Sequence, residues 1–586
     1  QFAQRCIVGE DNTHYVHSKF PPFYRISPGS RTVPASITVP LAVTLISFFS
    51  SLANTPPTTA LRQTLEFSPK MEWRTMAPDS ITTPGITTES STTAPAPTVQ
   101  PVEITLYDPD GNYIGSGDHY VIENPRLWWC HNLGTPEMYA MDLSFVIDGK
   151  VSDSQRVDFG IRHIDSWFNE DGYRGFILNG KKVLVKGAGW TDDIFLRNPD
   201  SRNEIEVAYV KDMNMNTIRF ENIWGTSQNI YDICDREGIL ALVGWSCHWE
   251  WEVYTGKPND RNGCISTEED IDLISQSWKD QILWLRNHPS IICWYAASDM
   301  LPRPALEQRY LDILAEIDDR PYTVHAGSSK SPLSGPSGMK MWGPYEWQAP
   351  YYWYSEEGKG NAVGFNTETG IGAQFPVYES LVKFIPEDQL WPVGDAYDYH
   401  TTTSRDALHD LNELKMVIDK RMGGASNLED FIRKAHFVDY EGTRAMVEAH
   451  RVNVPRSTGI IQWMLNSAWP SLYWQMYDWY MVPTSAYWSV KKGCTPQQLI
   501  YNYGNNKVYA VNDEKADASL NASMTVYGLD GTVIGESSTS VNMPMGCSFE
   551  VFEVPAVDQV GFVFLTLADA SGNVVARNEY VLAEVM

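Results

Sequence analysis

Helix and strand patterns alternate through the middle of the chain, and this alternation restricts the possible folds more than any other feature. EIEVAYVKDMNMNTIRFENI predicts a helix followed by a strand at residues 217–220. The unit returns in YDICDREGILALVGW, in SWKDQILWLRNHPSIICWYAASD and in EQRYLDILAEIDDRPYTVHAG. Short strands that follow helices pair in parallel through right-handed crossovers. The repetition predicts a (β/α)8 barrel, whose chemistry takes place where the strands end.

The regions on both sides of this alternation have a β-sheet pattern. VEITLYDPDGNYIGSG, residues 102–117, alternates, turns at Asp-Pro-Asp-Gly and alternates again, as a β-hairpin does. The same pattern of alternation, turn and alternation occurs in SMTVYGLDGTVIGES, residues 523–537. We therefore expect a multidomain protein with a central (β/α)8 TIM barrel at 166–495. Immunoglobulin-like β-sandwich domains at 102–165 and 496–586 would flank it.

The N-terminal region gives weaker signals. Residues 1–76 have no clear periodicity, and the Pro-, Thr- and Ser-rich residues 77–101 are typical of a linker. Residues 37–53 are apolar but contain a proline and several hydroxyl side chains, so buried strands are favoured over a membrane span. TTPGITTESSTTAPAPT is typical of an O-glycosylated stalk, and Asn521 begins a glycosylation sequon. With Gln1 in first place, these features favour a secreted protein.

Charge and composition limit the classes of molecule that the protein is expected to bind. The net charge of −28 argues against nucleic acid, and an acidic surface attracts polycations, although it also aids solubility. The chain has 21 Trp, 30 Tyr and 21 Phe, whose rings could stack on sugars or simply fill cores. None of the eight cysteines has CxxC spacing, which argues against a zinc or redox site and leaves room for one or two disulfides. Without P-loop, GxGxxG or HExxH motifs, we expect no cofactor and no catalytic metal.

Three acids follow apolar strand patterns: Glu221 after NTIRF, Asp299 after IICWYAAS and Glu368 after AVGFNT. A lone acid there is costly unless it is used or paired, and an ion pair of Glu221 with Arg219 is the structural alternative. Two carboxylates across a pocket are the groups that glycoside hydrolysis needs, one protonated and one ionised. Proximity produces that split because two like charges cannot both ionise cheaply.

Seven segments together resemble glycoside hydrolase family 2, and within it the exo-β-D-glucosaminidases (exochitosanases). They are KVLVKGAGWTDDIFLR, MNMNTIRFENIWG, GILALVGWSCHWEW, AASDMLP, SGPSGMKMWGPYEWQAPYYWY, GFNTETGIGAQFP and IIQWMLNSAWPS. The resemblance covers roughly residues 120–586, and its specific parts are the Ser-Asp acid, the GMKMWGPYEW segment and the NTETG segment. Family members open with a jelly-roll domain, which residues 1–97 do not resemble, so the choice between exo and endo cleavage stays open.

The resemblance implies a retaining mechanism with Asp299 as general acid/base and Glu368 as nucleophile, their carboxyl groups about 5–5.5 Å apart. Glu221, in Arg-Phe-Glu-Asn, matches the family's Arg-Leu-Glu-Gly motif, which implies substrate binding. Related barrels have Asn before the catalytic acid, where this chain has Ser298. We hypothesise that the smaller serine leaves room for the ammonium group of glucosamine beside the carboxylates.

The implied activity is release of β-linked D-glucosamine from the non-reducing end of chitosan or its oligosaccharides. A β-mannosidase or other family 2 β-glycosidase is one alternative, and a non-catalytic carbohydrate-binding protein on the same scaffold is another. The expected partner is a carbohydrate, with no nucleic acid and no membrane span, and the oligomeric state is left open. Further candidates for substrate binding are strand-end aromatic and polar residues: Trp190, Asp193, Tyr345, Trp347, Trp463, Asn466 and Trp469.

Overall fold

The computed structural model describes residues 62–66 and 102–583, apart from residues 118, 148, 222–226, 245–246, 356–359, 402–409, 514 and 558–559. The predictions for the apolar stretch 37–53, the linker and nearly all of residues 1–76 lie outside this part. In the part described, no helix combines the length and apolar character needed to cross a membrane. Its seven cysteines are all free thiols, most of them buried.

The first β-domain is built on the predicted hairpin. Asp108 accepts hydrogen bonds from the backbone N–H groups of Asp110 and Asn112, and Gly111 takes the positive φ of +80° that the turn requires. The resulting antiparallel sheet has the order β3-β2-β5-β6, and β1 pairs with β4 beside it. The strands are β1 (Arg62–Glu66), β2 (Glu103–Tyr107), β3 (Tyr113–Ser116), β4 (His119–Glu123), β5 (Met138–Ile147) and β6 (Lys150–Gly160).

A short antiparallel sheet leads from this domain into the central one. Its strands are β7 (Ile164–Phe168), β8 (Arg174–Leu178) and β9 (Lys181–Val183). The central sheet that follows is parallel, in the order β14-β13-β12-β11-β10-β18-β17. Its strands are β10 (Val185–Trp190), β11 (Thr217–Phe220), β12 (Leu240–Val243), β13 (Ile291–Tyr295), β14 (Tyr322–Thr323), β17 (Gly364–Thr369) and β18 (Ser457–Gln462).

The sixth strand of the barrel differs from the regular pattern. Between β14 and β17, Lys340 forms a single parallel bridge to Asn366 in β17. Gly338 and Gly343, both at positive φ, bracket this residue and keep the segment from running on as an extended strand. A small hairpin of β15 (Lys330–Ser331) and β16 (Gly335–Pro336) precedes it. The barrel-centred multidomain fold is nevertheless confirmed.

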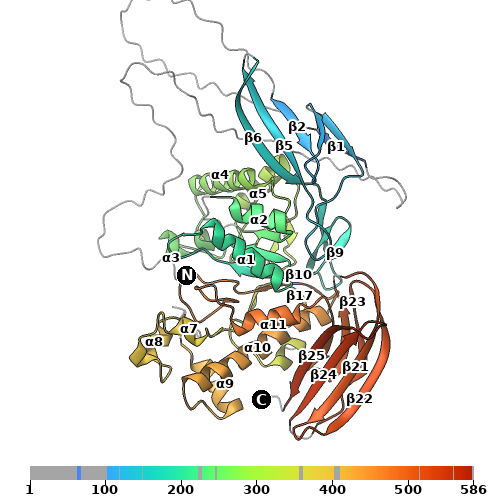
Figure 1. Ribbon diagram of the computed structural model, residues 1–586. Helices are drawn as coiled ribbons and strands as arrows, with labels where there is room; N and C mark the ends of the chain where they lie inside the picture. Colours follow the sequence, from blue (N-terminus) through green and yellow to red (C-terminus); the bar gives the residue numbers. More distant parts are fainter. Residues whose placement is uncertain are drawn as a thin grey trace, which may run out of the picture.

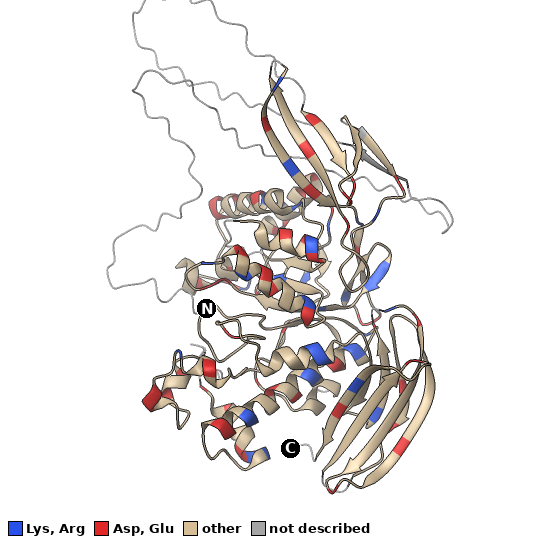
Figure 2. Ribbon diagram, viewed as in Figure 1, with Lys and Arg blue, Asp and Glu red and all other residues tan. Residues whose placement is uncertain are grey.

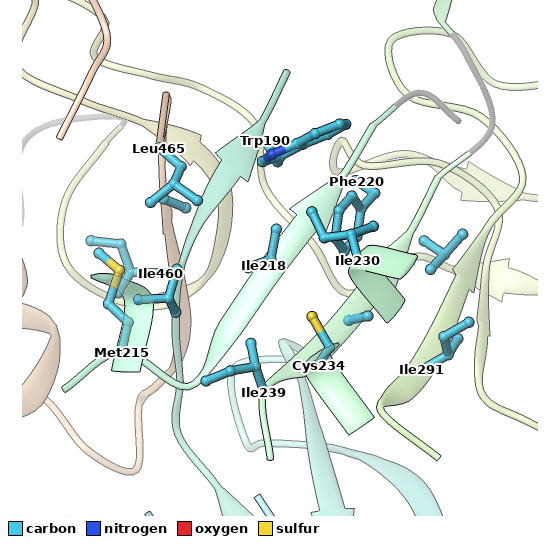
Figure 3. Close-up of a cluster of buried hydrophobic side chains, with 14 of the residues drawn as sticks. Trp190, Met215, Ile218, Phe220, Ile230, Cys234, Ile239, Ile291, Ile460 and Leu465 are labelled. Atoms are coloured by element: carbon cyan, nitrogen blue, oxygen red, sulfur yellow. The ribbon is translucent and has the colours of Figure 1, made fainter. Parts of the chain in front are cut away.

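Helices pack around the parallel sheet (Figure 1). Apolar side chains of β10, β11 and α2, among them Trp190, Ile218, Phe220 and Ile230, form part of the barrel's main core (Figure 3). The helices are α1 (Asp200–Asp212), α2 (Asn229–Glu237), η2 (Cys247–Glu250), α3 (Glu252–Thr255), α4 (Glu268–Leu285), α5 (Pro304–Ile317), α6 (Pro350–Tyr354), α7 (Tyr378–Leu381), η3 (Glu387–Gln389), α8 (Asp395–Asp398), α9 (Asn412–Met422), α10 (Leu428–Val452) and α11 (Ser485–Gly493).

A β-sandwich follows the barrel and lies beside α10 and α11 (Figure 1). One sheet has the order β19-β20-β23 and the other β22-β21-β24-β25. Acidic positions are spread over the barrel helices and the β-domains (Figure 2), so the negative charge acts as a general field. The domain boundaries remain predictions. The strands are β19 (Gln497–Asn502), β20 (Lys507–Asn512), β21 (Ala518–Gly528), β22 (Val533–Met543), β23 (Cys547–Glu553), β24 (Gly561–Ala568) and β25 (Val574–Leu582).

Candidate active site

Three carboxylates from separate strands meet at the carboxyl end of the barrel. Glu221 directly follows β11, Asp299 follows β13, and Glu368 lies near the end of β17. One oxygen from each of the three lies within 4.8 Å of the others. Parallel strands all end on the same side of a barrel, which is why acids at three strand ends converge. The structure therefore brings together the three acids that the sequence analysis selected.

A buried guanidinium lies among these acids. Arg219 points inward from β11 and donates from Nη1 to Glu368 Oε1 at 2.6 Å and to the carbonyl of Thr367 at 3.1 Å. Its Nη2 donates to Ser298 Oγ at 3.0 Å and lies 3.6 Å from Glu221 Oε1. The side chain is only 2% exposed, so solvent screens these charges weakly. Arg219 thus offsets part of the negative charge that the carboxylates concentrate.

Glu368 has the better-stabilised carboxylate. Besides Arg219, the hydroxyl of Tyr345 donates to its Oε2 at 2.9 Å. Burial raises the pKa of Glu368, Arg219 opposes the rise, and the charges of Glu221 and Asp299 add to it. Two donors, one of them a cation, favour the ionised form that a nucleophile needs.

Asp299 has a different environment. The indole N–H of Trp251 donates to its Oδ2 at 2.7 Å, and Ser298 Oγ lies 3.5 Å from its Oδ1. Burial, followed by the charge of Glu221, raises the pKa of Asp299. The charge of Asp299 also raises the pKa of Glu368, so the contacts of these two groups decide which one keeps a proton. Asp299 receives no direct hydrogen bond from Arg219, which favours Asp299 as the proton carrier.

Ser298 connects the set. Its hydroxyl donates to Glu221 Oε1 at 2.7 Å and accepts from Arg219. Ser298 is also only 2% exposed. Its two hydrogen bonds make it part of the buried network around the acids. The side chain of Ser298 therefore links Glu221 to Arg219, directly beside Asp299 in the sequence.

Several known proteins are similar to this chain in sequence. The family model "Glycosyl hydrolases family 2" matches residues 79–162, and "Mannosidase Ig/CBM-like domain" matches residues 504–585. Exo-β-D-glucosaminidases of Amycolatopsis orientalis and Streptomyces avermitilis are each 35% identical over 79% of this chain, and the matches cover 46% and 52% of those proteins. The chain belongs to glycoside hydrolase family 2.

Solved structures extend the comparison. The crystal structure of the Amycolatopsis orientalis exo-chitosanase CsxA is similar to this family 2 chain with a TM-score of 0.75 and 32% identity. The match covers 82% of this chain and 60% of that one. A β-D-mannosidase from Dictyoglomus thermophilum, at 19% identity and a TM-score of 0.67, shares the fold. The chain spans about half the length of the curated relatives it matches.

Of the remaining predicted residues, Tyr345 and Trp463 lie at the acids. Tyr345 contacts Glu368, and the guanidinium of Arg219 lies 5.3 Å from the ring centre of Trp463. The ring of Trp463 also packs on β10, where a Cβ added to Gly189 would come within 2.7 Å of it. Gly189, the second glycine in KGAGW, is therefore what allows Trp463 to lie against this strand.

Two other predicted residues have structural contacts. The indole N–H of Trp190 donates to Glu206 at 2.7 Å, and this side chain is buried in the barrel core. Asn466 exchanges hydrogen bonds of 2.9 Å with the backbone of Thr191 in both directions. Among the described residues, neither hydrogen-bonds to Glu221, Asp299 or Glu368. Their positions hold the segments after β10 and β18 together and do not support a direct sugar contact.

The last three predicted residues also have partners away from the acids. Trp347 donates its indole N–H to the carbonyl of Val438 in α10 at 3.3 Å. Asp193 accepts from the indole of Trp479 at 3.1 Å. Trp469 stacks on His400 with ring centres 5.0 Å apart and is half-buried. The roles of all three residues in sugar binding remain predictions.

Sequence reasoning missed three residues of the site. Arg219 was considered only as an ion-pair partner of Glu221, although it also holds Glu368 and Ser298. Glu250 and Trp251, which both contact the Asp299 segment, were not selected. The available signal was GWSCHWEW, a run of aromatic and acidic residues directly after strand β12.

Two groups of described residues have the ligand atoms that a metal would need. In the first, Glu221, Asp299 and Glu368, the cation of Arg219 already supplies positive charge. The second group is Asp232, Asp235 and His288. His288 Nδ1 lies 2.6 Å from Oδ2 of Asp235, and Oδ1 of the same aspartate accepts from the backbone N–H of Ser290 at 3.0 Å. Both groups are satisfied by protein partners, so neither requires a metal to explain its arrangement.

Proposed function

We propose that this chain acts as a retaining exo-β-D-glucosaminidase, which removes β-linked D-glucosamine from the non-reducing end of chitosan or its oligosaccharides. The observation that carries the proposal is the pair of unlike carboxyl groups: Glu368, held by Arg219 and Tyr345, opposite Asp299, held by Trp251. Their nearest oxygens lie within 4.8 Å, which supports the shorter of the two carboxyl spacings found in glycosidases and hence retention. The names of the most similar relatives support the substrate.

In the first step, Glu368 attacks the anomeric carbon while Asp299 gives its proton to the glycosidic oxygen. The C–O bond to the leaving sugar breaks, and a glycosyl-enzyme ester forms on Glu368. In the second step, Asp299 takes a proton from water, whose oxygen attacks the same carbon and releases Glu368. The configuration at that carbon is inverted twice and so retained.

Glu221 supports the preference for an amino sugar. Its Oε1 is held by Ser298, and its carboxylate lies close to the other two acids. An ammonium group at the sugar's second carbon would gain charge-assisted hydrogen bonds there, whereas an N-acetyl group would bring bulk without charge. The net charge of −28 also favours a polycationic substrate. A polymeric substrate, together with the exposed sequon residue Asn521, supports an extracellular location.

The decisive experiment compares substrates and site variants. Purified protein is incubated with chitosan oligomers, their N-acetylated equivalents and β-mannosides, beside Asp299→Asn and Glu368→Gln. We expect glucosamine to be released by the wild type alone. Release of mannose would favour a β-mannosidase, and internal cuts in long oligomers would show endo cleavage. Binding of oligomers without release from any substrate would favour a carbohydrate-binding protein.

A further inference from the structure

Two adjacent residues of the β12–α4 loop contact the backbone and the side chain of Asp299. The first, Glu250, is 8% exposed and lies at the end of η2. Its Oε1 accepts from the backbone N–H of Ser298 at 2.7 Å. Its Oε2 accepts from those of Asp299 at 2.7 Å and Met300 at 2.6 Å. One carboxylate therefore holds three consecutive peptide groups, which fixes the backbone that carries Asp299.

The second residue, Trp251, acts on the side chain. Its indole N–H donates to Asp299 Oδ2 at 2.7 Å. The carbonyl oxygen of a carboxylic acid is a stronger acceptor than its hydroxyl oxygen, so the indole favours Oδ2 as the unprotonated oxygen. A proton on Asp299 is then favoured on Oδ1, the oxygen near Ser298 Oγ. The indole thus selects which oxygen of the carboxyl carries the proton.

The loop itself is braced from several sides. The thiol of Cys264 donates to the carbonyl of Glu250 at 3.4 Å. Gly263, at a φ of +80°, brings the returning chain so close that an added Cβ would lie 3.3 Å from the Cα of Glu250. Lys257 contacts Asp270 in the first turn of α4. Glu250 and Trp251 are therefore presented by a segment tied to itself and to the barrel.

We propose that Glu250 and Trp251 are the positioning residues for the acid/base Asp299. Glu250 holds its backbone, and Trp251 orients its carboxyl group so that Oδ1 donates the proton to the leaving oxygen and later accepts one from water. This inference rests on the proposed function, because it assigns a step of that reaction to a particular oxygen. Neither residue needs to touch the reacting atoms.

The first test uses Trp251→Phe and two substrates that differ in the leaving group. The β-1,4-linked glucosamine dimer needs a proton on the departing sugar, whereas 2,4-dinitrophenyl β-D-glucosaminide does not. Loss of acid catalysis costs about 100-fold or more, so we expect kcat/KM to fall by about that factor for the dimer and by far less for the aryl substrate. Trp488→Phe, at an exposed tryptophan of α11, is the matched control and should change neither.

The pH profile gives a signature that a purely structural role would not produce. The hydrogen bond from Trp251 favours ionised Asp299 and so lowers its pKa. Without the indole, that pKa rises, and the basic limb of kcat/KM should move upward by about one pH unit. Equal losses on both substrates with an unmoved basic limb would overturn the assignment of Trp251.

Glu250→Gln tests the second part of the proposal, that Glu250 holds the backbone of Asp299. An amide offers only one acceptor oxygen and would turn N–H donors toward the N–H groups of residues 298–300, displacing Asp299. We expect a loss of about 100-fold on the dimer, since a displacement of about 1 Å can cost that much, and a smaller loss on the aryl substrate. Glu252→Gln, two residues on and exposed, is the control. Wild-type kinetics in Glu250→Gln would overturn the role of Glu250.

A direct titration separates this inference from the proposed function. Asp299 is followed by 13C NMR of labelled aspartate carboxyl groups, with Asp299→Asn identifying the signal. Its pKa should be higher in Trp251→Phe than in the wild type, whichever glycoside the enzyme cleaves. An unchanged pKa would refute the positioning role. Absence of cleavage of any β-glycoside by the wild type would instead refute the proposed function.

Discussion

Arg219 Nη1 lies 2.6 Å from Glu368 Oε1, so a cation from one barrel strand stabilises the carboxylate at the end of another. Both side chains are almost fully buried, at 2% and 7% exposure. Through Nη2 the same guanidinium holds Ser298, which in turn holds Glu221. The ionisation of Glu368 and, less directly, of Asp299 therefore depends on this one arginine.

Replacing Arg219 with methionine should move the acidic limb of the pH–rate profile upward. Burial already raises the pKa of Glu368, and Arg219 opposes that rise. Loss of a neighbouring cation raises a carboxyl pKa by about 1–3 units, so the nucleophile would be protonated over a wider pH range. Measurement of kcat/KM from pH 4 to pH 9 checks this. Arg219→Lys keeps the charge and should shift less, and an unmoved limb in Arg219→Met would exclude this tuning.

Tyr345→Phe removes the second donor to Glu368, a hydrogen bond of 2.9 Å to Oε2. We expect kcat/KM to fall about 10-fold, because the carboxylate loses a contact that fixes its orientation. The acidic limb should also rise slightly, since the lost bond favoured the ionised form. Steady-state kinetics at several pH values measure both effects. Tyr378→Phe, at an exposed position of α7, should behave as the wild type does. Unchanged kinetics in Tyr345→Phe would mean that Arg219 alone orients Glu368.

Much of the site could be predicted because strand-end acids follow from one-dimensional patterns. The sequence predicted strand 217–220 with the boundaries that β11 has, and that placed Glu221 at the mouth of the barrel. Contacts between side chains of different strands were harder to predict from the sequence. Whether Arg219 pairs with Glu221 or Glu368 depends on how far β17 lies across the barrel, which no local pattern records. The same holds for Trp251, whose loop must first fold back onto Asp299.

The sequence could not predict which way the side chains of the aromatic and amide candidates face. A tryptophan at a strand end can face the pocket or the helix layer, and its hydrophobicity is the same in both cases. Trp190 faces Glu206 of α1 and the core, whereas Trp463 faces Arg219. Gly189, which has no side chain, leaves the space that the ring of Trp463 fills. The sixth strand was unpredictable for a related reason, because positive-φ glycines around Lys340 limit its pairing.

Glu221→Gln should weaken the preference for glucosamine over glucose. The substitution keeps the shape and the hydrogen bond with Ser298 but removes the charge that would attract an ammonium group. A hydrogen bond to a charged group is worth about 1.5–3 kcal/mol, so the ratio of kcat/KM values for aryl β-glucosaminide and aryl β-glucoside should fall about 10-fold or more. Competition assays with both substrates measure it. If the ratio survives, the ammonium is recognised by other groups.

Asp513→Asn should destabilise the junction between the barrel and the C-terminal sandwich. Asp513 lies 3.0 Å from Lys186 of β10 and 2.5 Å from Arg451 of α10, and all three side chains are at most 2% exposed. Removing the carboxylate breaks its buried ion pairs with Lys186 and Arg451, which costs about 3–5 kcal/mol. Thermal unfolding followed by circular dichroism checks this. Glu579→Gln, which breaks an exposed ion pair with Lys492, is the control and should cost less than about 1 kcal/mol.

The pH dependence of this stability has a definite sign. Burial alone would raise the pKa of Asp513, but Arg451 and Lys186 hold it below its usual value. The stabilisation is therefore fully present above the unfolded pKa of about 3.9 and is lost as the pH falls through the lower folded value. The difference in Tm between the wild type and Asp513→Asn should be constant from pH 6 to pH 8 and shrink below pH 4. A difference that stays constant down to pH 3 would show that Asp513 acts through packing and not through its charge.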